Sequence, residues 1–179
     1  MNRSCCSVLF VAMSLGAAFA DSDLPFKMPA GHLNLVFSVT DADAVHKVYG
    51  EAIGLERMPD IDFPGDPYMI RYRGGASEIK FIVTGHDLPA HEGGMRTARG
   101  IRLLALMFPS DEQENMQARF QNAGLEWPEF TQGSRPEYNF QYGMIYDGDG
   151  NQVELVFLDG APEEKFKQVQ IGLAVSDLA

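Results

Sequence analysis

Apolar residues recur along this chain with two different spacings, one typical of a strand and one typical of a helix. Residues 33–39, LNLVFSV, are mostly apolar and predict a strand. In the segment that follows, Val45, Val48, Tyr49 and Ala52 have the i, i+3, i+4, i+7 spacing of a helix with one apolar face. The pattern therefore predicts a strand followed by an amphipathic helix.

The same plan occurs a second time, beginning at Arg102. The two stretches are LNLVFSVTDADAVHKVYGEAIGLE and RLLALMFPSDEQENMQARFQNAGLE, and both end on Gly-Leu-Glu. The ends of the units also align without a gap, YRGGASEIKFIV over YDGDGNQVELVF, which places Lys80 over Glu154. Since each unit has room for two further extended segments before its last strand, the repeat is predicted to be strand, helix, strand, strand, strand (βαβββ).

Two βαβββ units, the second closing on DGDGNQVELV, resemble the vicinal oxygen chelate superfamily, which includes glyoxalase I, extradiol dioxygenases and bleomycin-resistance proteins. The resemblance implies an α+β fold in which the two modules form a cupped, barrel-like mixed sheet with the helices outside. We accordingly expect one domain over residues 31–160, with modules at about 31–84 and 101–158.

The first 20 residues have the pattern of a secretion signal. A short basic region at Arg3 precedes an apolar run, and small residues occur at Ala18 and Ala20. The run is shorter than the roughly 20 residues that a membrane span needs, which argues against an anchor. We therefore expect cleavage after Ala20, an N-terminal extension at residues 21–30, and a periplasmic or secreted protein.

Charge and cysteine content narrow the classes of partner. The chain has a formal net charge of −11, and an acidic surface repels phosphate backbones and anionic lipids. Neither nucleic acid nor, after signal cleavage, a membrane is expected as a partner. Both cysteines, Cys5 and Cys6, lie in the signal, so the mature chain has no thiol nucleophile and no thiolate ligand. The expected partner is a small-molecule ligand.

The C-terminal residues 161–179 continue the repeat. Their last stretch, VQIGLAVSDLA, resembles the opening strand of a module once more. Because a third opening strand has nothing to pair with in a two-module sheet, we predict a linker and the first strand of a second, truncated domain of the same type. The alternative is a C-terminal strand of the present domain. A second such domain or a homodimer partner is the expected protein contact.

Catalytic members of the superfamily hold a divalent metal through one residue on the first and one on the last strand of each module. The positions that resemble these ligands are Asn34 and Lys80 in the first module, and Leu103 and Glu154 in the second. Only Glu154 is a good ligand, because leucine has no donor atom and lysine brings a positive charge. We therefore expect a degenerate metal site without a cofactor.

The equivalence of Lys80 and Glu154 suggests what replaces the metal. Superfamily geometry brings the two positions together, and a buried carboxylate needs a partner. An ion pair between Lys80 and Glu154 is therefore predicted, and the rival expectation is that both side chains reach solvent.

Strand alternation places small or apolar residues on the same face as these four positions. Such a face suits a small, partly apolar ligand, but the same side chains can equally close the cup as core. The predicted pocket, with Val156 beside it, comprises Asn34, Val36, Ser38, Lys80, Ile82, Leu103, Ala105, Met107 and Glu154.

The sequence favours a metal-free binding or scaffold domain without catalytic residues. The alternative is a metal-dependent enzyme, a glyoxalase-like lyase or a ring-cleaving dioxygenase, whose site lies in a later domain or is rebuilt from His32 and Glu154. Zn, Ni, Mn or Fe would then be the cofactor. His86 and His91 lie between the modules, where a solvated loop is the ordinary expectation.

Overall fold

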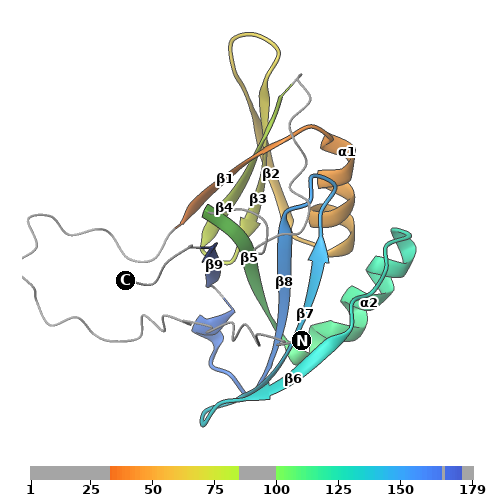
Figure 1. Ribbon diagram of the computed structural model, residues 1–179, viewed down its shortest axis with the longest axis vertical. Coiled ribbons are helices and arrows are strands. Elements are labelled where there is room, and N and C mark those ends of the chain that lie inside the picture. Colours follow the sequence, from red (N-terminus) through yellow and green to blue (C-terminus); the bar gives the residue numbers. More distant parts are fainter. Residues whose placement is uncertain (1–32, 85–99, 167, 175–179) are drawn as a thin grey trace, which may run out of the picture.

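Two mixed β-sheets and a layer of helices make up this protein, whose structure is a computed structural model (Figure 1). The structure describes residues 33–84, 100–166 and 168–174. The first sheet has the strand order β1-β4-β3-β2, and the second has the order β6-β7-β8-β5-β9. These orders confirm the α+β class and the two modules, although the sheets stay separate and open instead of closing into a barrel.

The first module has the predicted strand, helix and three further strands. Its helical segment consists of α1 and a run of wider π-type turns, η1, and the four residues at helical spacing are all buried as predicted. Asp41 caps this segment by accepting a hydrogen bond from the amide of Ala44. The elements are β1 (Asn34–Val39), α1 (Ala42–Val45), η1 (His46–Ala52), β2 (Glu56–Asp62), β3 (Tyr68–Gly74) and β4 (Ser77–Val83).

The second module repeats this order, and its opening strand pairs in parallel with its last strand as in the first module. Val36 lies opposite Lys80, and Ala105 lies opposite Glu154. The predicted alignment of Lys80 with Glu154 is therefore confirmed as strand register. The elements are β5 (Gly100–Pro109), η3 (Ser110–Glu112), α2 (Gln113–Asn122), β6 (Phe130–Ser134), β7 (Asn139–Tyr146) and β8 (Gln152–Asp159), followed by η4 (Glu163–Lys165) and β9 (Val169–Ala174).

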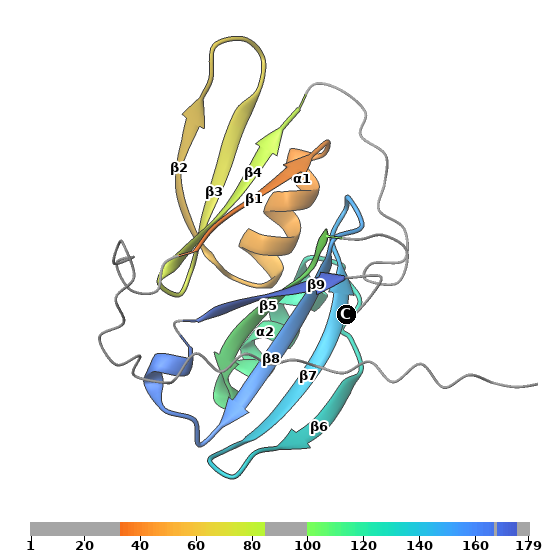
Figure 2. The ribbon, with the colours of Figure 1, turned by 60° about the vertical axis from the view of Figure 1, so that its left-hand side comes forward.

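Both modules contribute to one hydrophobic core. Figure 2 shows the helices on one side of the two sheets, and the buried residues of both modules form a single cluster between these layers. The helices also contact each other directly, because Arg119 of α2 donates to the carbonyls of Ala52 and Ile53 at 3.3 and 3.0 Å. These bonds satisfy carbonyls at the end of the first helical segment that otherwise lack a partner.

The strand β9 corrects one expectation about the C-terminal residues. It pairs antiparallel with β5, from Ala174 opposite Gly100 to Val169 opposite Leu106, and Val169 belongs to the core. The expectation that this segment has no partner strand is wrong, and the alternative of a further strand of this domain is the observed one. A second domain beyond it stays a prediction.

Several expected segments lie outside the described residues. These are the signal, the N-terminal extension, the inter-module linker with His86 and His91, and the final five residues. Within the described ranges, no helix has both the length and the apolar character needed to cross a membrane.

Candidate functional site

The DGDGN turn before β8 connects the two modules. Asp147 is buried, and its carboxylate accepts hydrogen bonds from the Tyr49 hydroxyl at 2.9 Å and from the backbone and side-chain amides of Asn151 at 2.8 and 3.0 Å. Asp149 of the same turn accepts from the backbone amide and hydroxyl of Thr40 at 3.0 and 2.8 Å. The motif therefore holds the start of β8 against the first module.

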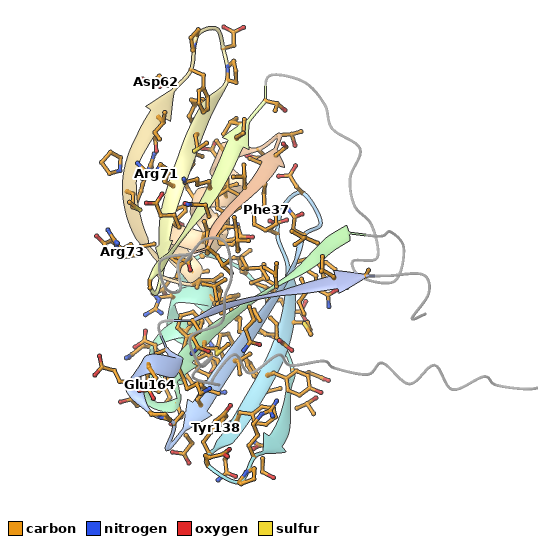
Figure 3. The ribbon with its side chains drawn as sticks, turned by 90° about the vertical axis from the view of Figure 1, so that its left-hand side faces the viewer. Phe37, Asp62, Arg71, Arg73, Tyr138 and Glu164 are labelled. Atoms are coloured by element: carbon orange, nitrogen blue, oxygen red, sulfur yellow. The ribbon has the colours of Figure 1, made fainter. Side chains whose placement is uncertain are left out.

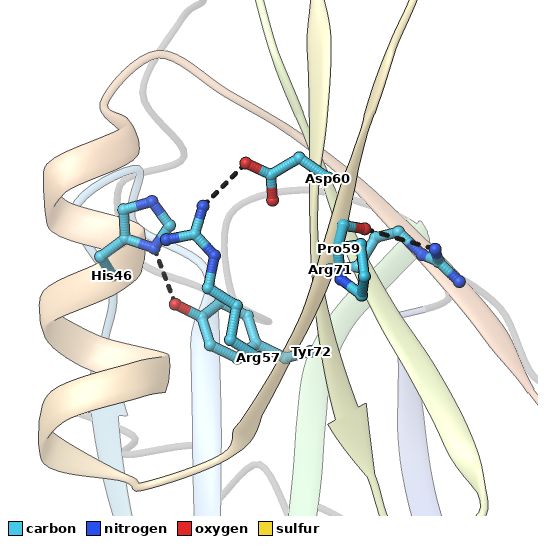
Figure 4. A network of polar contacts seen from close by, with 6 residues as sticks. All are labelled: His46, Arg57, Pro59, Asp60, Arg71 and Tyr72. Carbon is cyan, nitrogen blue, oxygen red and sulfur yellow. Dashed lines mark hydrogen bonds and ion pairs between the residues drawn. The ribbon is translucent and has the colours of Figure 1, made fainter.

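Charged residues gather on the face of the first sheet that is turned away from the helices, called here the open face. Tyr72, Ile79 and Phe81 point into the core. By strand alternation their sequence neighbours point the other way, so the charged members of the open face are Arg71, Arg73, Glu78 and Lys80. Figure 4 shows this arrangement, with Tyr72 reaching towards the helix and Arg71 on the opposite side of the strands.

Lys80 has its ion-pair partner on this open face. Its Nζ lies 3.3 Å from Oε2 of Glu78, and the same oxygen lies 2.9 Å from Nη2 of Arg71. The predicted ion pair between Lys80 and Glu154 is therefore wrong. Glu78 takes its place because side chains two residues apart on a strand share a face, whereas Glu154 belongs to the other sheet.

Arg71 is the central cation of this cluster. Besides the bond to Glu78, its Nη1 donates to the carbonyl of Pro59 at 3.3 Å. Its Nε is buried and has no hydrogen-bond partner within the described part of the chain. Arg71 and Lys80 hold the pKa of Glu78 below its usual range. Neither Arg71 nor Glu78 was predicted as a site residue, although charges at every second position of MIRYRG and SEIK are a signal for a charged sheet face.

Glu154 lies on the corresponding face of the second sheet, since Val153 and Leu155 on either side of it point into the core. It is 8% exposed, and its strand neighbours are Ala105 and Met144. Burial raises the pKa of Glu154 above that of an ordinary glutamate. No cation among the described residues forms an ion pair with it. The site thus contains a carboxyl group that is held in a poorly hydrated place, without a compensating charge from the part of the chain that the structure describes.

The predicted pocket residues divide into an open half and a buried half. Asn34, Val36 and Ser38 on β1 are exposed, whereas Leu103 and Ala105 on β5 are only 5 and 3% exposed. Two clefts, of about 520 and 460 Å³, lie instead beside β7 and at the ends of β6 and β7, and none of the predicted pocket residues lines them.

Known proteins match this chain in structure and not in sequence. No family model and no curated protein matches it. Among solved structures, a glyoxalase family protein from Enterococcus faecalis matches with 20% identity and a TM-score of 0.50 over 72% of this chain and 96% of that one. The protein SMU.1112c matches with 21% identity and a TM-score of 0.55 over 73% and 99%.

A glyoxylase/bleomycin resistance protein/dioxygenase domain from Frankia sp. EAN1pec matches with 18% identity and a TM-score of 0.50 over 77% of this chain and 96% of that one. This chain has the vicinal oxygen chelate fold. The resemblance in the βαβββ repeat is thus confirmed as a fold. Identities of 18 to 21% carry no conclusion about substrate or chemistry.

Within the described ranges, no three His, Cys, Asp or Glu side chains are grouped so that they could hold a metal ion. His46 is the one histidine that the structure describes, and its Nδ1 lies 2.7 Å from the Tyr72 hydroxyl on the helix side of the sheet. Burial lowers its pKa. His32, the alternative ligand beside Glu154, lies outside the described residues.

Glu154→Gln is expected to stabilise the protein at pH 7 by about 1 to 2 kcal/mol, because an amide has no charge to desolvate. The raised folded-state pKa means that ionisation of Glu154 opposes folding. Its neutral form therefore favours folding below the unfolded pKa, and this benefit is lost as pH rises through the folded pKa. Urea unfolding at pH 7 and at about pH 4 should show the gain of the variant only at pH 7.

Glu56→Gln is the matched control, since the side chain of Glu56 is 68% exposed on the first sheet. It should leave the free energy of unfolding unchanged within about 0.5 kcal/mol. If Glu154→Gln instead destabilised the protein at pH 7, its carboxylate would be held by a partner that stabilises the charge.

Proposed function

We propose that this chain is a metal-free small-molecule-binding domain with the vicinal oxygen chelate fold. The observation that carries the proposal is the set of charges at the positions where catalytic members of the superfamily hold a metal. Lys80 occupies one of them and is paired with Glu78. Glu154 occupies another, but it is buried next to apolar neighbours and Leu103 adds no donor. A cation at Lys80 repels a metal ion, so binding would rely on hydrogen bonds, side-chain charges and apolar contact.

The open half of the predicted pocket supports a ligand that arrives over the first sheet. Asn34 and Ser38 offer polar groups there, and Val36 leaves an apolar side chain 53% exposed. Exposed apolar surface beside a few convergent polar groups suits a small, partly apolar ligand. The periplasmic or secreted location belongs to the same proposal and is supported by the signal pattern in the first 20 residues.

The mature chain from Asp21 onward is expected to bind no tightly held divalent metal. Purified protein would be dialysed, analysed for Zn, Ni, Mn and Fe, and titrated with each ion while the urea midpoint is followed. A metal that binds only the folded state raises the stability of that state. Because no tight binding is expected, the urea midpoint should stay unchanged when each ion is added.

The alternative enzyme makes the opposite prediction. A metal-dependent lyase or dioxygenase that uses His32 and Glu154 would retain about one ion per chain after dialysis. Glu154→Gln would then remove the ion and cancel the shift of the urea midpoint. That pair of results would replace the proposed binding domain with the enzyme.

A further inference from the structure

We propose that Arg71 and Lys80 form a binding site for the anionic group of a small organic acid, a carboxylate or a phosphate. The inference rests on the proposed small-molecule-binding function and names the chemical class of the ligand. The site lies on the open face, where Lys80 and Arg71 occupy directly opposed positions of β4 and β3. Figure 3 shows Arg71 on the first sheet with its neighbour Arg73.

The charges of this cluster do not balance. Arg71 and Lys80 share the single carboxylate of Glu78, whose Oε2 lies 2.9 and 3.3 Å from their nitrogens. The other described arginines of this sheet form one-to-one pairs, Arg73 with Glu56 at 2.9 Å and Arg57 with Asp60 at 2.7 Å. Counted over the described residues, the cluster therefore has one positive charge in surplus, on a chain whose formal net charge is −11.

The environment strengthens the attraction of this surplus charge for an anion. The side chains of Arg71 and Lys80 are 18 and 19% exposed, compared with 48% for each of the paired arginines, Arg57 and Arg73. Ionic interactions gain strength where water is partly excluded. The buried Nε of Arg71 also lacks an acceptor within the described residues, so an anion that displaces Glu78 and reaches this nitrogen would give it a partner.

Glu78 acts as an internal competitor for this site. Its carboxylate has the geometry of the anion that the site would bind, and its side chain is 30% exposed, so it has room to turn towards solvent. A ligand would displace Glu78 from the two cations and place its remaining atoms near β1. There Asn34 lies opposite Glu78 and Val36 lies opposite Lys80, which provides an amide and an apolar side chain for the ligand body.

The test measures binding of inorganic phosphate, acetate and hexanoate to the mature chain by NMR titration at low salt. We expect saturable binding of at least one probe, weakened about 10-fold by Arg71→Gln and by Lys80→Gln, since each removes a charge-assisted hydrogen bond. Glu78→Gln should tighten binding about 5-fold or more, because it removes the competing charge while an amide oxygen still accepts from Arg71.

Arg73→Gln is the control, because Arg73 lies on the same face in a balanced and more exposed pair, and it should change the affinity less than about 2-fold. Hexanoate binding without phosphate binding would assign the site to carboxylates, and the reverse would assign it to phosphates. Urea midpoints of all variants would exclude unfolding as the cause.

The outcome of this titration is separable from that of the metal test. No saturable binding of any probe, or no tightening in Glu78→Gln, would overturn the anion site and leave the metal-free binding domain in place. A tightly bound metal would overturn the proposed function whatever the anion titration shows.

Discussion

Replacing Asp147 by alanine is expected to lower the free energy of unfolding by about 3 kcal/mol, since charged hydrogen bonds are lost and a buried donor is left without an acceptor. That donor is the hydroxyl of Tyr49, whose side chain is 0% exposed. Burial beside Asp147 raises the pKa of Tyr49, so the hydroxyl keeps its proton and must donate. Urea unfolding followed by the fluorescence of Trp127, the single tryptophan, measures the change.

The turn offers two comparisons for this result. Asp149→Ala removes two bonds to Thr40 that lie at the exposed side of the turn, and it should cost about 1 kcal/mol. Tyr49→Phe keeps the ring and leaves Asp147 with its amide donors, so an intermediate loss is expected. A loss below about 1 kcal/mol for Asp147→Ala would mean that the turn is held by apolar contact alone.

The turn also lies very close to the first helix. A Cβ on Gly148 would lie 2.6 Å from the Cβ of Ala44, which is nearer than two carbon atoms can pack. Only glycine therefore allows the turn to reach α1. The acidic turn that resembles the superfamily signature in the sequence thus serves to join the modules, and through the start of β8 it sets the position of Glu154.

Phe81→Ala in the first module is expected to destabilise the whole domain by about 4 kcal/mol, the usual cost of deleting a buried aromatic ring. Phe81 is 0% exposed and lies 4.5 Å from the ring of Tyr49 and 6.3 Å from that of Tyr72, measured between centroids. Because both modules share one core, Trp127 in the second module should report the full loss in a single transition.

Phe120→Ala is the matched variant in the second module, where Phe120 lies 5.1 Å from the ring of Trp127 and is 1% exposed. It should produce a similar loss in the same single transition, seen equally by fluorescence and by far-ultraviolet circular dichroism. Two separated transitions, or a Trp127 signal that Phe81→Ala leaves unchanged, would show that the modules unfold independently.

Most of the fold follows from patterns that act over short distances in the chain. The helical spacing of Val45, Val48, Tyr49 and Ala52 predicts their burial correctly, and the alternation in β8 places Val153 and Leu155 in the core. The alignment of the two units predicts that Lys80 and Glu154 occupy equivalent strand positions, which the register confirms. Such predictions succeed because spacing along a strand or helix decides which face a side chain occupies.

The site depends on contacts between segments that are distant in sequence. Lys80 and Glu154 occupy equivalent positions in the two modules, but this does not bring their side chains together. Lys80 instead forms its ion pair with Glu78, two residues away on the same strand. The hydrogen bond from Tyr49 to Asp147 joins residues in different modules, and no pattern in the neighbouring sequence predicts it. Sequence spacing likewise does not reveal that β9 completes the second sheet by pairing with β5.

The sequence by itself therefore determined the two modules and the faces of their strands. Only the tertiary structure decided that Arg71 and Lys80 share one carboxylate, that Glu154 is buried without a described cation, and that one half of the predicted pocket is open. The physical reason is that strand periodicity sets the direction of a side chain, whereas its partner and its hydration depend on how whole sheets pack.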